Sequence, residues 1–131
     1  MIRGRSQVSA AAEAEYAADV ALASRFEELL ARARNAEQAY RAAQAAAKPV
    51  SVQYSLAREL DAALTDAMRA AYAAQRAEIG PRGYEDRIYR RKAMARPAVH
   101  AWTDEAERLL TMREAHRLTG FPPAAPIEVA S

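Results

Sequence analysis

The sequence of 131 residues has no cysteine, only four glycines and no long apolar run. The lack of cysteine excludes disulfide frameworks and thiolate metal sites. No apolar stretch approaches the roughly 18 residues that a membrane-spanning helix needs. No hydrophobic segment follows the basic residues at the start, so we also expect no secretory signal. These absences predict a cytoplasmic or virion protein that is neither secreted nor transmembrane.

Large apolar side chains are also scarce, whereas alanine is abundant. The chain has 35 Ala, but Val, Ile, Leu, Met, Phe and Trp together number only 26. Disordered chains combine such a composition with a high net charge, and here the net charge is only +2. Alanine is the best helix former. Four acidic residues also precede a basic residue by one helical turn: Glu28/Arg32, Glu37/Arg41, Asp86/Arg90 and Asp104/Arg108. We therefore expect helical order with a weak core.

The first third of the chain predicts one long helix over residues 9–47. Ser9 is a suitable N-cap, and no helix breaker follows before Pro49. This helix would be about 58 Å long at 1.5 Å per residue. Apolar residues recur along it in steps of four and three, which is typical of a coiled-coil or bundle seam. The seam comprises Leu22, Phe26, Leu29, Ala33, Ala36, Tyr40, Ala43 and Ala47.

Proline and glycine divide the rest of the chain into shorter segments. These are a linker over 48–54, a helix over 55–79 with Ser51 as an alternative start, helices over about 84–96 and 103–119, and an extended Pro-rich tail over 121–131. Gly80 ends the second helix, Pro97 ends or kinks the third, and Thr103 caps the fourth. The predicted fold class is all-α. A single domain over 1–120 contains the long N-terminal helix in an antiparallel hairpin, followed by the two shorter helices.

The length of the first helix and the scarcity of large apolar residues both favour an oligomer. A compact globule of this size has a radius of gyration near 14 Å, and a straight helix of about 58 Å does not fit inside it. Weak monomer cores are often completed by association. The expected interface residues are Leu22, Phe26, Leu29, Ala33, Ala36, Tyr40, Trp102, Phe121 and Ile127. Trp102 is alternatively a plug at a helix entry, and the tail is alternatively a frayed terminus.

Excess positive charge is concentrated in the third predicted helix. Six basic residues lie between positions 82 and 96, against only Glu85 and Asp86: Arg82, Arg87, Arg90, Arg91, Lys92 and Arg96. Arginine binds phosphate in a bidentate manner, so this segment is a candidate polyanion-binding site. The alternatives are a solvated bundle face and a contact with an acidic protein, because the chain as a whole is nearly neutral.

The sequence contains no pattern typical of catalysis, cofactor binding or metal binding. Of the two histidines, His100 is separated from Asp104 by the expected helix start at Thr103, and His116 lies on a different helix face from Glu114. We therefore predict a non-enzymatic structural or assembly protein without cofactor or small-molecule substrate. It acts as a homo-oligomer or a subunit of a larger complex, and a virion connector is one suitable setting. The alternative is a nucleic-acid-binding or packaging factor that uses residues 82–96. A membrane-surface role is disfavoured, because the apolar helix faces are mostly alanine.

Overall fold

The computed structural model describes residues 7–120 of the chain, and side chains up to residue 118. Its elements are α1 (Ala10–Ala23), α2 (Phe26–Ala45), α3 (Val50–Ile79), the 3-10 helix η2 (Pro81–Tyr84), α4 (Arg87–Ala93), α5 (Pro97–Ala115) and the π-helical turn η3 (His116–Gly120). No strand occurs among the described residues. The all-α prediction is therefore confirmed for this part of the chain.

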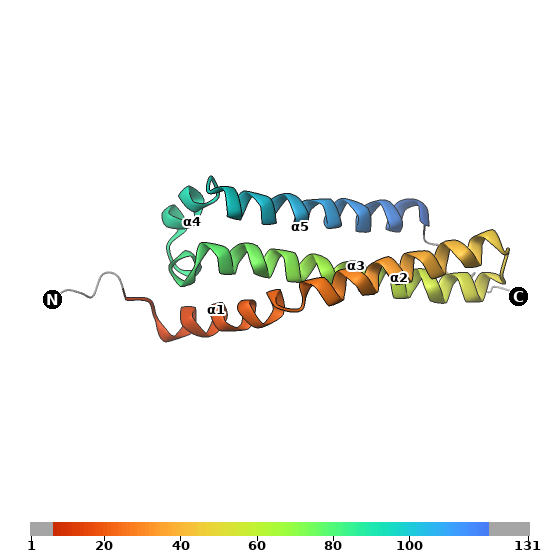
Figure 1. Ribbon diagram of the computed structural model, residues 1–131, viewed down its shortest axis with the longest axis horizontal. Helices are drawn as coiled ribbons and strands as arrows, with labels where there is room; N and C mark the ends of the chain where they lie inside the picture. Colours follow the sequence, from red (N-terminus) through yellow and green to blue (C-terminus); the bar gives the residue numbers. More distant parts are fainter. Residues whose placement is uncertain (1–6, 121–131) are drawn as a thin grey trace, which may run out of the picture.

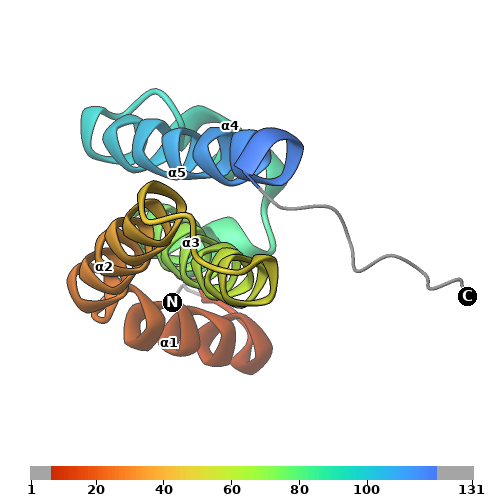
Figure 2. The same ribbon diagram turned by 90° about the vertical axis from the view of Figure 1, so that its right-hand side faces the viewer.

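Helix α3 is the central element of an elongated bundle. It runs back along α2 and then along α1, while α5 lies on its opposite side from α1 (Figures 1 and 2). The short α4 and η2 connect α3 to α5 at one end of the bundle (Figure 1). Alanines at 57, 63, 67, 70, 71, 73 and 74 are buried along α3. Small side chains at these positions let neighbouring helices approach closely, so few large residues are needed to fill the core.

The main core joins α2, α3 and α5, and a smaller cluster closes the α4 end. The large buried residues of the main core are Phe26, Leu29, Leu30, Tyr40, Leu60, Leu64 and Leu109. The smaller cluster contains Ile79, Ala93 and Val99. Helix α1 adds little to either cluster, because its only fully buried residue is Ala12.

The predicted single helix over residues 9–47 is wrong, because it is broken at Ser24 and Arg25. Helix α1 does begin where expected, with the Ser9 hydroxyl accepting a hydrogen bond from the amide of Ala12 at 3.0 Å. Neither residue at the break is a glycine or proline, and their ψ angles are −14° and 2°. The local sequence therefore permits a continuous helix. The break accompanies the packing of α1 against α3, which is a tertiary interaction.

The predicted linker over 48–54 is too long, because α3 already begins at Val50. Helix α2 ends in a tight reversal, in which the Lys48 amide donates to the Ala43 carbonyl at 3.0 Å. Ala47 lies in the left-handed region within this reversal, with φ of 51°. Pro49 then precedes the helix directly. The reversal needs only a few residues, so the second helix starts earlier than expected.

The two C-terminal helices also differ from their predicted bounds. The helix expected over 84–96 is shorter, because only the seven residues of α4 are α-helical within it, and η2 precedes α4 and ends at Tyr84. The third helix ends at Ala93, before Pro97 as expected, and Arg96 is extended. Pro97 also starts α5, because the first helical position needs no amide donor. Thr103 is consequently inside α5, where its hydroxyl donates to the Val99 carbonyl at 3.0 Å. The predicted tail over 121–131 lies outside the described residues.

Candidate interaction surfaces

The seam residues that were predicted to form an interface pack against other helices of the same chain. Six of them belong to the main core: Leu22, Phe26, Leu29, Ala33, Ala36 and Tyr40. Trp102 on α5 meets the ring of Phe26 edge-on, with the centroids 5.2 Å apart. The seam is therefore covered by other helices of the same chain. That these residues also form an interface between copies stays a prediction. Phe121 and Ile127 lie outside the described residues.

The turn between α2 and α3 forms the first candidate surface, which we name the hairpin end and define as residues 42–57. Helix α5 stops short of this turn (Figure 1), and the buried His116 that follows it contacts the carbonyl of Ala57. The exposed apolar residues of the hairpin end are Ala42, Ala45, Ala46, Ala47, Val50 and Val52. Only Lys48 is charged among these 16 positions.

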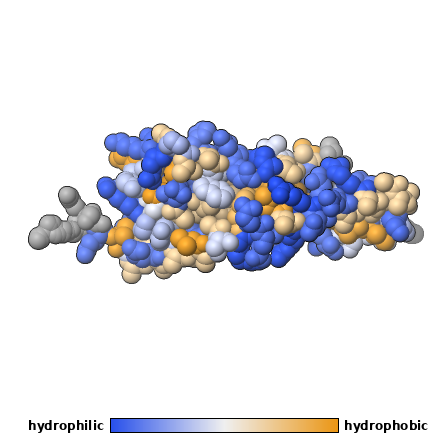
Figure 3. All heavy atoms as spheres, viewed as in Figure 1, coloured by the Kyte–Doolittle hydropathy of each residue, from blue (hydrophilic) through white to orange (hydrophobic). Residues whose placement is uncertain are grey.

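The space-filling view shows the same contrast in surface chemistry. Alanine and apolar residues cover most of the hairpin end, whereas hydrophilic residues dominate the middle of the molecule on this face (Figure 3). Val50 is 66% exposed although it is a large aliphatic residue. An apolar region with almost no charge is typical of a surface that contacts another protein.

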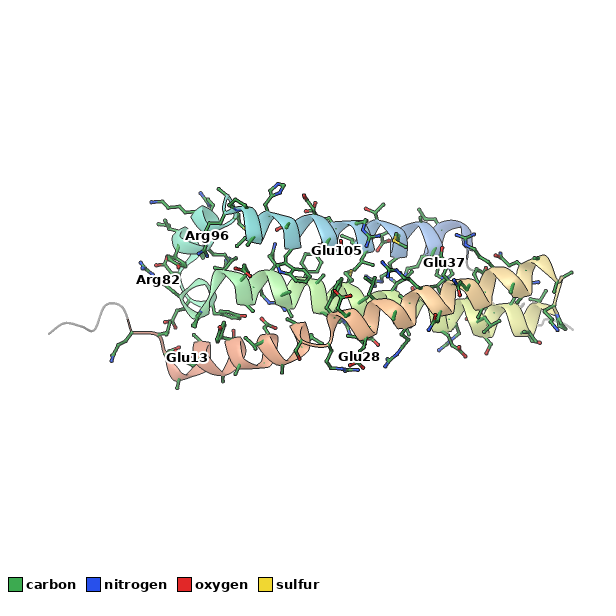
Figure 4. All side chains as sticks on the ribbon, viewed as in Figure 1. Glu13, Glu28, Glu37, Arg82, Arg96 and Glu105 are labelled. Atoms are coloured by element: carbon green, nitrogen blue, oxygen red, sulfur yellow. The ribbon has the colours of Figure 1, made fainter. Side chains whose placement is uncertain are left out.

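The second candidate surface lies at the opposite end of the bundle, on η2 and α4. We name it the cationic corner, and it comprises Arg82, Arg87, Arg90, Arg91, Lys92 and Arg96. Figure 4 shows Arg82 and Arg96 at this end of the molecule. Asp86 starts α4 by accepting a hydrogen bond from the amide of Tyr89 at 2.9 Å. That hydrogen bond lowers the pKa of Asp86, so its carboxylate stays charged within the corner.

Three of the six cations have structural partners. Arg90 donates to the carbonyl of Gly83 at 2.8 Å, and Arg96 donates to the carbonyl of Ile79 at 3.1 Å. These two guanidinium groups thereby satisfy carbonyls where α3 ends and η2 follows. Arg82 binds Asp86 at 3.2 Å and lies over the ring of Tyr89. The sequence signal for these roles was weak, because all three contacts depend on how η2 and α4 fold back.

All six cations are exposed, but the other three, Arg87, Arg91 and Lys92, have neither an acidic nor a carbonyl partner among the described residues. Arg87 and Arg91 line an open hollow of about 880 Å³, whose lining also includes the carboxylates of Glu85 and Asp86. The same two arginines line a second hollow of about 340 Å³ beside Met94. Ile88 is 68% exposed between them. The predicted polyanion-binding set is therefore divided into three structural residues and three that are available to a ligand.

One of the two histidines, His100, is placed differently from the prediction. Because α5 begins at Pro97, His100 and Asp104 lie one turn apart on the same helix, with Nδ1 and Oδ2 3.2 Å apart. Both side chains are exposed, so they form a surface pair. His116 is buried, and its Nε2 lies 2.8 Å from the carbonyl oxygen of Ala57. Its ring also meets that of Tyr40 edge-on. Across residues 7–120, no three His, Cys, Asp or Glu residues are grouped so that they could hold a metal ion.

Comparison with known proteins adds no relative. No protein-family model matches this chain, and no curated protein or solved structure shows significant similarity to it. Within the described part of the chain, no helix has both the length and the apolar character to cross a membrane. The two surfaces at the ends of the bundle are therefore the basis on which its function is inferred.

Proposed function

We propose that this chain is a non-enzymatic structural or assembly protein that acts as an oligomer or as a subunit of a larger complex. The observation that supports it is the hairpin end, where Val50, Val52 and a series of alanines are exposed with a single charge nearby. Burying such a surface against another protein lowers the free energy, because apolar area is removed from water. A cytoplasmic assembly and a virion connector are both settings that suit a rigid helical rod with an apolar end.

The test measures the molar mass in solution by light scattering, over a range of protein concentrations. We expect a multiple of 14.4 kDa for the wild type and at least about tenfold weaker association for the V50E/V52E variant. Acidic residues are favourable near a helix N-terminus, so this variant should keep α3 intact. The control variant A31E/A39E adds the same charge to exposed positions of α2 and should associate like the wild type. A wild type that remains at 14.4 kDa at every concentration would contradict self-association.

A second candidate function is nucleic-acid binding or packaging through the cationic corner. It is favoured by the three exposed cations that have neither an acidic nor a carbonyl partner among the described residues, Arg87, Arg91 and Lys92. The phosphates of a nucleic acid would release counterions on meeting them, so affinity should fall steeply with salt. The net charge of only +2 limits any attraction to this local surface.

Fluorescence anisotropy with a labelled duplex tests this second function. The R87A/R91A variant should lower the slope of log K against log salt by about 2, because two phosphate contacts are lost. The control variant R34A/R69A removes the same charge from exposed positions on α2 and α3 and should leave the slope nearly unchanged. Equal slopes for the two variants would reject the cationic corner as the binding surface.

A further inference from the structure

Helix α1 is attached to the bundle mainly by polar contacts and small side chains. The Ser9 hydroxyl donates to Glu85 at 2.7 Å, and Asp19 accepts from both Arg76 at 2.8 Å and the Tyr84 hydroxyl. Of its 14 residues only Ala12 is fully buried. Its largest apolar residue in the main core is Leu22, which is partly buried next to the break. The Tyr16 ring also meets that of Tyr84 edge-on, with the centroids 6.4 Å apart. Apart from Leu22 and Tyr16, the side chains that α1 would withdraw from the bundle are mainly small or polar.

The junction between α1 and α2 is already close to a continuous helix. Ser24 has φ −66° and ψ −14°, and Arg25 has φ −95° and ψ 2°. A regular helix requires ψ changes of only roughly 30° and 45° at these two residues. The Arg25 carbonyl already accepts the amide of Leu29 at 3.0 Å. Straightening would restore the remaining helical hydrogen bonds, and no glycine or proline between Ala10 and Ala47 opposes it.

A straight α1–α2 helix would span residues 10–45 and reach about 54 Å. It would carry α1 away from the C-terminal half of its own α3, where Arg76 now binds Asp19. The vacated side would present the Arg76 side chain of α3 and the Tyr84 side chain of η2, which now bind Asp19. The same α1 from a second copy is the segment whose shape and hydrogen-bonding groups fit that side without any new contact.

The charges of α1 also favour α1 of a second copy at this position. Helix α1 carries Glu13, Glu15 and Asp19 and has no basic residue. It lies at the end of the bundle that holds the cationic corner, as the positions of Glu13, Arg82 and Arg96 show (Figure 4). An acidic helix presented by a second copy would be attracted to that end.

We infer that two copies of this chain exchange α1. In the dimer, α1 and α2 form one continuous helix across Ser24 and Arg25, and α1 of each copy packs on α3 of the other. Asp19 then binds Arg76 of the partner subunit and Tyr84 of the partner subunit. This inference rests on the proposed oligomeric function and names its partner, a second copy of the chain. The hairpin ends of such a dimer remain free to make further contacts.

A charge-complementation experiment tests the exchange, with all chains in the V50E/V52E background so that hairpin-end contacts do not contribute. The variants D19R and R76D each place like charges together, both within a chain and in a homodimer. Co-refolding the two variants restores opposite charges only in an exchanged heterodimer. Native mass spectrometry measures the concentrations of the heterodimer and of the two homodimers. We expect the squared heterodimer concentration, divided by the product of the two homodimer concentrations, to exceed the value for random mixing at least about tenfold. The cis double variant D19R/R76D is the control and should dimerise like its parent.

Two hinge variants provide an independent measurement. Ser24 is exposed, and its hydroxyl donates only to the Ala21 carbonyl. Ser24→Ala favours the straight helix, whereas Ser24→Gly favours the broken one. The monomer–dimer dissociation constant should be about tenfold lower for Ser24→Ala than for Ser24→Gly, because each dimer contains two hinges. Equal constants, or random mixing of D19R with R76D, would overturn the exchange but leave the proposed assembly function intact. A wild type that never associates with itself would contradict both the exchange and the oligomeric form of the proposed function.

Discussion

Helix α3 meets α2 and α5 through one kind of contact and α1 through another. Towards α2 and α5 the contacts are leucine and aromatic side chains, with Leu60, Leu64 and Leu109 fully or almost fully buried. Towards α1 they are alanines and polar groups, chiefly the bidentate pair of Asp19 with Arg76. Apolar burial stabilises in proportion to area, whereas partly exposed ion pairs contribute little. We expect α2, α3 and α5 to unfold together and α1 to open at a lower free energy.

The largest expected effect comes from cutting a large side chain out of the main core. Leu109→Ala removes a fully buried leucine from α5, so it should lower the free energy of unfolding by about 2–5 kcal/mol. Urea denaturation monitored by circular dichroism measures this loss. Leu118→Ala is the matched control, because Leu118 is 83% exposed and should change stability by less than about 0.5 kcal/mol. Similar losses for both variants would show that burial does not set stability on this side.

A smaller loss is expected at the corner between α3 and α4, where Gly83 is packed against Ile79. A Cβ at position 83 would lie 2.5 Å from the Ile79 Cγ2 atom, and Ile79 is itself buried. Gly83→Ala should therefore cost about 1–3 kcal/mol through overpacking. In an Ile79→Leu background this methyl group is absent, so the same substitution should cost less in a double-mutant cycle. An unchanged cost would place the strain elsewhere.

The polar attachment of α1 predicts a local response to substitution. Asp19→Asn weakens the bonds to Arg76 and Tyr84, and the Arg76 side chain is 44% exposed, so solvent screening limits the global effect to about 1 kcal/mol or less. Hydrogen exchange should become faster in α1 and stay unchanged in α5. The reciprocal variant Asp61→Asn, which breaks the pair with Arg117, should loosen the end of α5 and leave α1 protected. Faster exchange throughout the bundle in either variant would contradict the view that the Asp19 and Asp61 pairs hold α1 and the end of α5 independently.

Acid pH should weaken the ion pairs of Asp19 and Asp61, because it protonates their carboxylates. Burial raises the pKa of Asp19, but the hydrogen bonds from Arg76 and Tyr84 and the Arg76 charge outweigh it, so the net shift is downward from 3.8. The hydrogen bond from Arg117 similarly lowers the pKa of Asp61. A lowered folded-state pKa contributes stability that is present above the unfolded-state value and is lost as pH falls through the folded-state value. Stability measured by urea titration should therefore decline below about pH 4, and less steeply in Asp19→Asn. Identical pH profiles would show that Asp19 titrates alike in both states.

The smallest expected effect is a gain at the hairpin end. Ala47 adopts a left-handed conformation, with φ of 51°, which is unfavourable for a residue with a Cβ. Ala47→Gly should relieve this strain and stabilise the protein by about 0.4–1 kcal/mol, partly offset by the greater chain entropy of unfolded glycine. Thermal unfolding detects the change, and Ala46→Gly, at a position with φ of −86°, should be destabilising. A loss at both positions would mean that the reversal is not strained.

The all-helical class was predictable because local interactions determine it. Abundant alanine and turn-spaced acid–base residues favour helix wherever they occur, and Ser9 marks the start of α1. The seam pattern also identified side chains that are packed, such as Phe26, Leu29 and Tyr40. It could not identify what they pack against, since a periodic apolar stripe looks the same whether another chain or the same chain covers it.

The helix boundaries and the division of the cationic corner were beyond local reasoning. Pro97 was expected to end or kink the third helix, which does end at Ala93, but that Pro97 also begins α5 was not expected, because the start was placed at Thr103. Arg90 and Arg96 were grouped with Arg87 as ligand-binding cations, but they satisfy carbonyls near the end of α3. A carbonyl distant in sequence becomes a partner only when the chain folds back, so charge counting could not separate these residues.

The sequence by itself determined that this protein is helical, which residues form its apolar seam and where its positive charge is concentrated. These properties follow from side-chain propensities and spacing along one helix. Only the tertiary structure decided that α3 fills the seam, that a helix without a breaker is interrupted at Ser24 and Arg25, and that three of the six cations find partners at the corner while three do not. Those outcomes depend on contacts between segments far apart in the chain, whose free energies no local pattern contains.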